Sequence, residues 1–202
     1  MKDKRRTQAD RTASTRKAIV AAARTLFAAH GYRDVGTEAV VAAAGTSRGA
    51  LYHHFADKID LFAAVSETVE ADALGRIATA VNAARDTDPV DLLRIGAATW
   101  LDVCSEPEIR RIVLVEAPAV LGWERWREIS TRHGIGLTQR LLSAAMAAGR
   151  VPHQPVEPLA HIILGALREA ALFLAHRREP NARREIGAVI DALIRSLCAT
   201  QP

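Results

Sequence analysis

The chain has 202 residues, of which 49% are hydrophobic, and a formal net charge of +4. This length and apolar share can fill one large core or two small ones, and no run approaches the roughly 20 consecutive apolar residues that span a bilayer. The two cysteines, Cys104 and Cys198, lie far apart, which argues against a disulfide framework and favours a reducing compartment. Because the N-terminus lacks the apolar segment of a secretion signal, we expect a cytoplasmic protein without a membrane partner.

The positive charge is concentrated at the N-terminus. Residues 1–17 carry seven basic and two acidic side chains, so the remaining 185 residues are nearly neutral. A basic arm on a neutral body suits a polyanionic partner, although a solvated terminal tail would have the same composition. We expect residues 1–10 to be disordered and a first amphipathic helix to run over about 13–30, with Gly31 as its C-terminal cap.

Residues 37–58 have the pattern of a helix-turn-helix. The first short helix starts at Gly36 or Thr37, since both residue types occur at N-caps, and Gly45 turns the chain. Ser47 is predicted to cap a second helix that ends near residue 55.

The outer face of this second helix suits contact with DNA. When Leu51 and Phe55 face inward, the side chains left for the outer face are Arg48, Gly49, Ala50, Tyr52, His53 and His54. Small residues let the backbone approach a duplex, and arginine can donate two hydrogen bonds to guanine. Tyrosine and histidine can contact phosphate or base edges.

The spacing of these residues resembles the DNA-binding domain of the TetR family of transcriptional repressors over about residues 13–62. The resemblance is carried by Gly31-Tyr32, Val40-Val41, Ala44-Gly45, Ser47, Gly49, Leu51-Tyr52, His54-Phe55 and Lys58. It implies phosphate contacts from Thr37, Tyr52, His54 and Lys58. It also implies base-edge contacts from Arg48, Gly49, Ala50, Tyr52 and His53, with Ser47 in the same DNA-binding set. Glu38 replaces an arginine of some family members and is expected to point away from the phosphates.

Beyond residue 58 the helical period of the apolar residues guides the interpretation. A long helix is predicted from Lys58 to about residue 85, with a core face of Ile59, Phe62, Val65, Val69, Ile77 and Val81. Asp88 and Pro89 mark the start of the next helix. Ser105 and Glu108 have the spacing of a capping box for another, which should stop or kink near Pro118.

The remaining helices are predicted for about 122–148, 158–177 and 181–197, and no strand pattern of period two occurs. We therefore predict an all-α fold of about nine helices. Residues 1–58 would form the arm and the DNA-binding domain, and residues 59–202 a domain for effector binding and dimerisation.

Aromatic and polar residues of the second half could line an apolar cavity with few polar groups. With guidance from the family, we expect this set to be Trp100, Cys104, Val113, Glu116, Trp123, Trp126, His133 and Arg168. The alternative is that the tryptophans only fill the core, which is their common fate.

The last two predicted helices carry wide apolar stripes. The resemblance implies a four-helix interface with a second copy, formed by Ile162, Ile163, Ala166, Ala170, Phe173, Ile186, Val189, Ile190, Leu193 and Leu197. Packing of the same stripes onto the chain's own core is the alternative, and we expect both to occur.

Enzymatic motifs are lacking in the sequence. Cys104 and His133 have no spacing that supports a nucleophile and its base, and adjacent His53 and His54 diverge on a helix and make a poor metal pair. We expect no catalytic residue, metal or cofactor.

The resemblance implies a homodimeric repressor of a palindromic operator, released by a largely apolar small molecule. The alternative is an effector-independent DNA-binding or architectural protein with a filled helical body.

Overall fold

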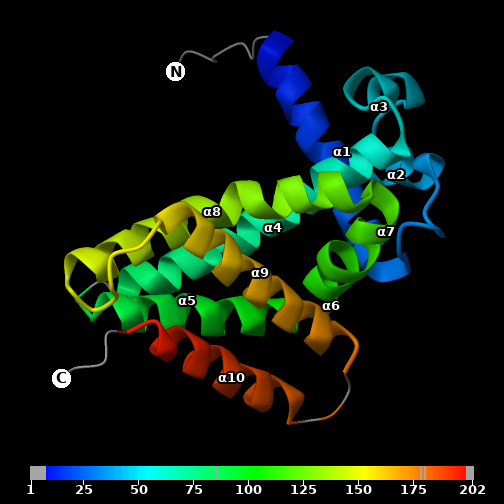
Figure 1. The fold of residues 1–202 in the computed structure, drawn as a ribbon. Helices are drawn as coiled ribbons and strands as arrows, with labels where there is room; N and C mark the ends of the chain where they lie inside the picture. Colours follow the sequence, from blue (N-terminus) through cyan, green and yellow to red (C-terminus); the bar gives the residue numbers. More distant parts are fainter. Residues whose placement is uncertain (1–7, 85, 178, 180, 199–202) are drawn as a thin grey trace.

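The computed structural model describes residues 8–84, 86–177, 179 and 181–198. Within these residues it contains ten α-helices, one π-helical segment and no strand, so the predicted all-α fold is confirmed (Figure 1). Most of the expected basic arm, including Lys2, Lys4, Arg5 and Arg6, lies outside the described residues. Residues 8–10, which we expected to be disordered, belong to the first helix.

A three-helix head occupies one end of the molecule. Its helices are α1 (Gln8–His30), α2 (Thr37–Ala43) and α3 (Arg48–His54). The Ser47 side chain accepts a hydrogen bond from the Ala50 backbone N–H at 3.1 Å, as its position at the N-cap predicts. The apolar sides of the three helices meet at Ile19, Ala23, Phe27, Val40 and Leu51, all buried.

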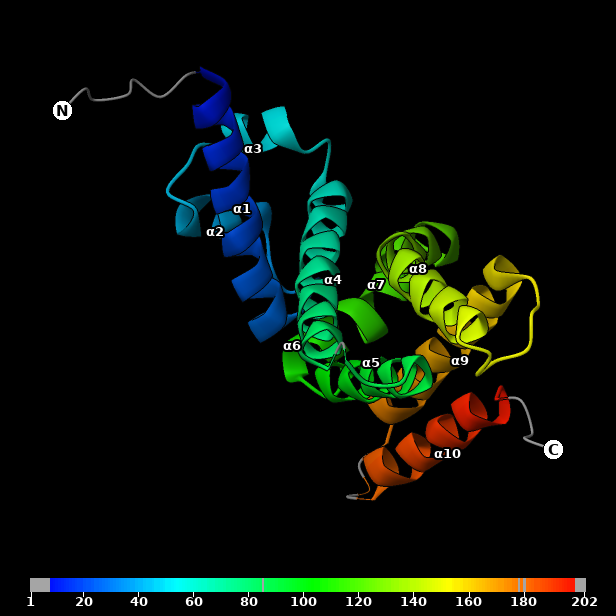
Figure 2. The same cartoon turned by 90° about the vertical axis from the view of Figure 1, so that its left-hand side faces the viewer.

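The long helix α4 (Lys58–Ala83) leads from the head into the body, standing beside α1 in Figure 2. Asp57 caps it by accepting from the Asp60 N–H at 2.7 Å. The predicted core face is wrong at Ile59, which is 40% exposed, whereas Leu61 is fully buried. Residues 61–66 of α4 are all buried, so neighbours surround the helix there, whereas Ile59 is the second residue of α4 and precedes this enclosed stretch.

The segment after α5 (Pro89–Cys104) differs from the expected capped helix. It consists of α6 (Pro107–Ile109), the π-helix η1 (Arg110–Glu116) and α7 (Ala117–Leu121). The capping box is wrong because the Ser105 hydroxyl donates to the Leu101 carbonyl, while the Glu108 carboxylate accepts from the Arg24 guanidinium at 2.8 Å. The chain stays helical past Pro118, and it changes from π to α just before this residue, which lacks the N–H that an α-helix would offer to Leu114.

The rest of the body consists of α8 (Trp123–Ala147), α9 (Val156–Ala175) and α10 (Ala182–Ser196). In Figure 1, α8 and α4 run above α5, α9 crosses in front of them and α10 lies below. Asp88 caps α5 through the Val90 N–H at 2.8 Å, as predicted. One continuous core joins Phe27 and Phe62 near the head to Ile112 and Trp126 in the body. The domain boundary expected after residue 58 falls at the first residue of α4 and stays a prediction.

Candidate functional site

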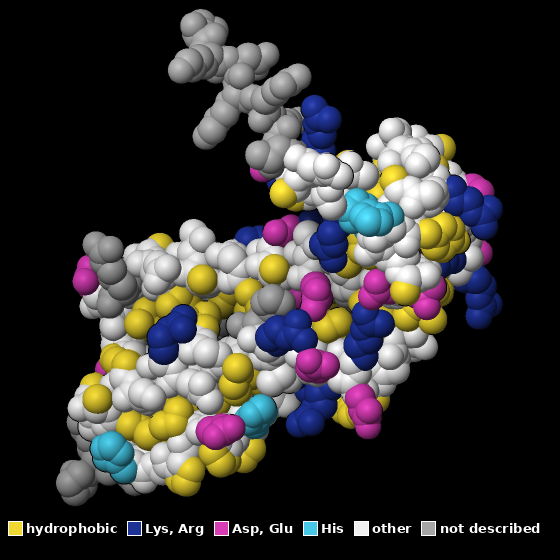
Figure 3. All heavy atoms as spheres, turned by 90° about the horizontal axis from the view of Figure 1, so that it is seen from above, with side chains coloured by type: hydrophobic (Ala, Val, Ile, Leu, Met, Phe, Trp, Pro, Cys, Tyr) yellow, Lys and Arg dark blue, Asp and Glu magenta, His cyan; other side chains and the backbone are white. Residues whose placement is uncertain are grey.

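Helix α3 presents its polar residues to solvent on the outer side of the head. Arg48, Gly49 and His53 are exposed and 43% of Tyr52 is exposed, whereas Leu51 is fully buried. Ala50 and His54 are half-buried. Figure 3 shows lysine, arginine and histidine side chains on this end of the molecule. The helix therefore offers a rigid polar face, held in place by an apolar residue on its other side.

Arg48 has two neighbours on this surface. Its guanidinium carbon lies 5.6 Å from the centroid of the Tyr52 ring, within the range of a cation–π contact. The Glu38 carboxylate lies 3.6 Å from the same guanidinium, and the side chains of both partners are about 70% exposed. An exposed ion pair of this kind adds little stability, so the arginine can exchange Glu38 for a base or a phosphate.

Lys58 and His54 lie at the rim of the head. The Lys58 ammonium is 4.2 Å from the centroid of the Tyr32 ring, and partial burial lowers the pKa of this lysine, while Asp34 and Glu116 oppose that shift. Partial burial also lowers the pKa of His54, and positive charge on His53 and Arg16 lowers it further. Thr37, another expected phosphate contact, is the half-buried first residue of α2.

A cavity of about 80 Å³ lies inside the body. Four of the residues expected at a pocket lie on its wall: Trp100, Val113, Trp126 and Arg168. Most of the wall is apolar and comes from α4, α5, η1, α8, α9 and α10. This part comprises Leu74, Ile77, Leu93, Gly96, Ala97, Leu114, Gly134, Leu137, Leu141, Ile163, Leu164, Leu167 and Ile194, together with the two tryptophans and Val113.

Three other residues of the expected pocket lie elsewhere. Cys104 is buried in the core, where burial raises the pKa of its thiol. The Glu116 carboxylate accepts a hydrogen bond from the Tyr32 backbone N–H at 2.9 Å, on the side of the head. Trp123 is 60% exposed because it is the first residue of α8 and projects from the bundle. The side chain of His133, the remaining member of the set, is outside what the structure describes.

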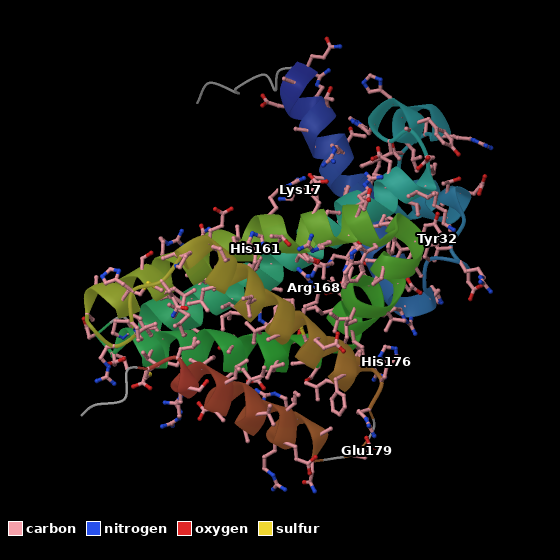
Figure 4. All side chains as sticks on the ribbon, in the orientation of Figure 1. Lys17, Tyr32, His161, Arg168, His176 and Glu179 are labelled. Atoms are coloured by element: carbon pink, nitrogen blue, oxygen red, sulfur yellow. The ribbon has the colours of Figure 1, made fainter. Side chains whose placement is uncertain are left out.

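The cavity has one polar end. Glu70 of α4 is only 3% exposed, and its carboxylate accepts a hydrogen bond from the Ser130 hydroxyl of α8 at 2.7 Å. Burial raises the pKa of Glu70 to about 7, although Ser130 and Arg168 pull it down. Arg168, labelled on α9 in Figure 4, stacks over Trp126 at 5.4 Å and donates to the Thr131 hydroxyl at 3.3 Å.

Sequence reasoning missed Glu70 and Ser130. A signal for Glu70 was present, because it lies three and seven residues before the buried Ala73 and Ile77 and so shares the apolar face of α4. A carboxylate on such a face is costly to bury and points to a partner or a ligand. Ser130 gave no comparable signal, since single serines are common on helices.

The cavity wall is linked to η1 through the Trp126 side chain and to α9 through that of Trp100. The indole N–H of Trp126 donates to the Val113 carbonyl of η1 at 3.0 Å, and the indole N–H of Trp100 donates to the Leu167 carbonyl at 3.2 Å. Val113 and Leu114 themselves lie on the wall. A change in the shape of the cavity therefore acts directly on this π-helical segment.

The same segment holds the end of α1. The Arg111 guanidinium donates to the carbonyls of Ala28 and Ala29, both at 2.6 Å. Gly31 has a φ of +84°, and a Cβ added there would lie 2.6 Å from the Glu116 carboxylate. Glycine is therefore required both by the backbone conformation and by the close approach of Glu116. The cavity wall and the head are thus connected through η1 as well as through α4.

Two family descriptions match the chain. Residues 19–65 match "bacterial regulatory proteins, tetR family", and residues 90–197 match "tetracyclin repressor-like, C-terminal domain". The second match alone covers more than half of the sequence. The chain belongs to the TetR family. The crystal structure of a TetR-family transcriptional regulator from Pectobacterium atrosepticum is 36% identical, with a TM-score of 0.84 over 98% of this chain and 100% of that one.

Curated relatives of this TetR-family chain include transcriptional regulators matched over part of their length. The repressor AcnR of Corynebacterium efficiens is 32% identical over 109 residues, which are 50% of this chain and 57% of AcnR. The regulator AcrR of Shigella flexneri is 33% identical over 100 residues, which are 50% of this chain and 46% of AcrR. The chain thus spans about half the length of these relatives.

The fold alone is shared with RolR, whose crystal structure contains resorcinol. That structure is 19% identical, with a TM-score of 0.75 over 96% of this chain and 97% of RolR. The family matches, AcnR and the Pectobacterium structure identify this TetR-family protein as a DNA-binding transcription regulator. The members of the family are transcription factors and not enzymes.

Proposed function

We propose that this protein is a cytoplasmic, homodimeric repressor that binds a palindromic operator and releases it when a small effector occupies the internal cavity. The observation that carries the proposal is the shared role of η1. Its Val113 and Leu114 line the cavity, and its Arg111 and Glu116 hold the end of α1 and the following turn.

For the DNA interface we propose the contacts that the family resemblance implies. Thr37, Tyr52, His54 and Lys58 bind phosphate, and Arg48, Gly49, Ala50, Tyr52 and His53 reach base edges, with the capped start of α3 at Ser47 in the same surface. The exposure of Arg48, Tyr52 and His53 supports this assignment. Few side chains per protomer can distinguish bases, so two copies of the head are required for sequence specificity.

For the dimer we propose the outward stripes of α9 and α10. Ile162 and Val189 are 66% and 61% exposed, and Phe173 and Leu193 are exposed as well. The half-buried members of the same stripes are Ala166, Ile186 and Leu197. The other expected interface residues, Ile163, Ala170 and Ile190, are buried in the chain's own core, so the proposed interface does not depend on them.

The apolar composition of α9 supports the proposal that a second copy covers this surface. Over an 18-residue window α9 has a mean hydropathy of 1.5, and it is the only helix in the described part of the chain long and apolar enough to cross a membrane, with 33% of that window buried. It packs against α5, α8 and α10 within the body. A second copy would cover its outward apolar residues, and Figure 3 shows hydrophobic patches on the face of the body seen from above.

Sedimentation of the double variant Ile162→Glu/Val189→Glu tests the dimer. Because two buried carboxylates would oppose association, the variant should sediment as a monomer and lose most operator affinity. Ala147→Glu, at an exposed position near the end of α8, is the matched control and should remain a dimer. A dimeric double variant would place the interface elsewhere.

Release follows from the route between cavity and head. Helix α4 carries Glu70, Leu74 and Ile77 on the wall and begins at Lys58, twelve residues or about 18 Å before Glu70. An effector that shifts α4 and η1 would change the spacing between the two heads. A difference of a few kcal/mol in effector binding between the two states is sufficient for release.

Selection of bound duplexes from a random DNA pool, followed by a screen for compounds that release them, tests the proposal. We expect an inverted repeat whose half-sites lie about 34–36 Å apart, or a multiple of that distance, on one side of the duplex. Recovery of unrelated sequences would contradict a sequence-specific dimer. A clear operator that no compound releases would favour the effector-independent alternative.

A further inference from the structure

The polar groups of the cavity wall lie together near Trp126. Among the described residues the wall has four polar side chains, and one of them, Thr138, already donates its hydroxyl to the Gly134 carbonyl at 3.2 Å. The other three, Glu70, Ser130 and Arg168, come from α4, α8 and α9. Farther along α4 and α8, apart from Thr138, the wall consists of apolar residues such as Ile77 and Leu141.

Glu70 and Arg168 keep unused hydrogen-bonding capacity. Within the described part of the chain, the Glu70 carboxylate accepts one hydrogen bond, from Ser130, and the Arg168 guanidinium donates one, to Thr131. No ion pair within 4.0 Å joins Glu70 to Arg168 in that part of the chain. A carboxylate can accept about four hydrogen bonds and a guanidinium can donate five. Both groups border the cavity, so a ligand there can use this capacity.

The opposite charges of the two groups restrict the ligand. An anion would be repelled by ionised Glu70 and a cation by Arg168, and either would lose its hydration on entry. A hydroxyl group suits both partners, because it can donate to the carboxylate and accept from the guanidinium at the same time. It also suits Glu70 in its protonated form, which can donate to the ligand oxygen.

The volume limits the apolar part of the ligand. At about 80 Å³ the cavity is smaller than the roughly 150 Å³ engineered cavity that binds benzene. One six-membered ring would therefore enter only with small shifts of the wall, to which Val113 and Leu114 of η1 belong. A ligand with a larger apolar part would have to displace whole helices.

We infer that the cavity binds a compact, uncharged molecule with a hydroxyl group on an apolar body, the hydroxyl lying between Glu70 and Arg168. The inference rests on the proposed function, in which this cavity is the effector site. Glu70 and Arg168 determine specificity by accepting from and donating to the hydroxyl, and the leucines, isoleucines and tryptophans of the wall contact the apolar body.

Calorimetric titration of the full-length protein with four single-ring compounds tests the inference. Phenol should bind at least about tenfold more tightly than toluene, its analogue without the hydroxyl, because a hydrogen bond to a charged group is worth at least this factor. Benzoate and benzylammonium should bind more weakly than phenol. Equal or tighter binding of any of these three, or no binding of phenol, overturns the inference.

Substitutions of the polar residues assign the effect to named groups. Glu70→Leu should weaken phenol binding about tenfold and leave toluene binding unchanged, whereas Thr138→Val, at a wall hydroxyl already bonded to Gly134, should change phenol binding less than about twofold. Glu70→Gln keeps the shape and removes the negative charge, so it should bind benzoate more tightly than the wild-type protein does. Unchanged phenol selectivity in Glu70→Leu, or unchanged benzoate binding in Glu70→Gln, contradicts the assignment.

Operator release separates this inference from the proposed function. Phenol that binds in the calorimeter without weakening operator binding would leave the inference standing and remove the proposed release mechanism. Release by toluene with no preference for phenol would leave the release mechanism standing and remove the inferred chemistry.

Discussion

Helix α3 and the internal cavity place their polar groups in opposite surroundings. On α3, Arg48 and Tyr52 point to solvent and the buried Leu51 fixes them from behind. In the cavity, Glu70 is buried in a mostly apolar wall. Polar residues of α3 can therefore change without much effect on folding, whereas Glu70 is tied to the stability of the body. The proposed DNA recognition is therefore separable from fold stability in the head, whereas the proposed effector recognition is coupled to fold stability in the body.

The largest effects are expected at two adjacent residues of α3. Leu51→Ala removes a fully buried side chain and should lower the free energy of unfolding by about 2–5 kcal/mol. Tyr52→Ala should change it by less than about 1 kcal/mol but weaken operator binding about tenfold or more, since a charged hydrogen bond to phosphate is lost. Urea unfolding and fluorescence anisotropy of labelled operator measure the two quantities. Wild-type operator affinity in Tyr52→Ala would remove α3 from the interface.

In the body, the stability should depend on pH through Glu70. Its pKa rises from 4.5 in the unfolded chain to about 7 in the fold, because burial and the charge of Glu67 outweigh Ser130 and Arg168. The folded state then binds the proton more tightly than the unfolded chain does. The contribution of Glu70 to the free energy of unfolding is therefore fully present below pH 4.5 and is lost as the pH rises through about 7. The loss is on the order of 3 kcal/mol.

Glu70→Gln is the control for that pH dependence. Because glutamine does not titrate, the difference in unfolding free energy between the wild-type protein and this variant should change between pH 4.5 and 7 and then level off. A constant difference across this range would show that Glu70 keeps an ordinary pKa.

The basic arm should have a smaller effect, seen in the salt dependence of DNA binding. Replacing Lys4, Arg5 and Arg6 by alanine should flatten the slope of log affinity against log salt by about 0.9 for each lost phosphate contact. The measurement is operator binding at several salt concentrations. An unchanged slope would mean that the arm is only a solvated tail.

The smallest effect is expected for Glu38 on α2. Glu38→Ala frees the Arg48 guanidinium, which lies 3.6 Å away, and should strengthen binding to random duplex DNA by about two- to threefold. The ratio of operator to random-DNA affinity should fall slightly, because Glu38 no longer restrains the arginine. A Glu38→Gln variant with wild-type affinities would show that the charge has no such role.

Helix starts were predictable where their signals are local. The caps at Ser47, Asp57 and Asp88 involve backbone groups two or three residues away, so the sequence contains both partners side by side. The capping box at Ser105 failed for the opposite reason. Its Glu108 is bound by Arg24, 84 residues away, and no local pattern reports such a contact.

The two candidate sites differ in the same way. The residues proposed to contact DNA occupy one contiguous segment, 37–58, whose motif resembles a known family, and the structure places Arg48, Tyr52 and His53 on its exposed side. The cavity draws residues from six elements between positions 70 and 194, and the sequence anticipated its tryptophans and Arg168 but not Glu70. Tertiary packing decides which side chain of each helix meets the others, and the period of a single helix does not contain that information.

The coupling between cavity and operator is tested most directly by the affinity of phenol for the free protein and for the operator-bound protein. Binding linkage requires that a ligand that weakens operator binding by some factor is itself bound more weakly by the complex, by the same factor. We predict a loss of phenol affinity of at least about fivefold on saturation with operator, equal to the loss of operator affinity on saturation with phenol. Equal phenol affinity in both states would contradict release through the cavity.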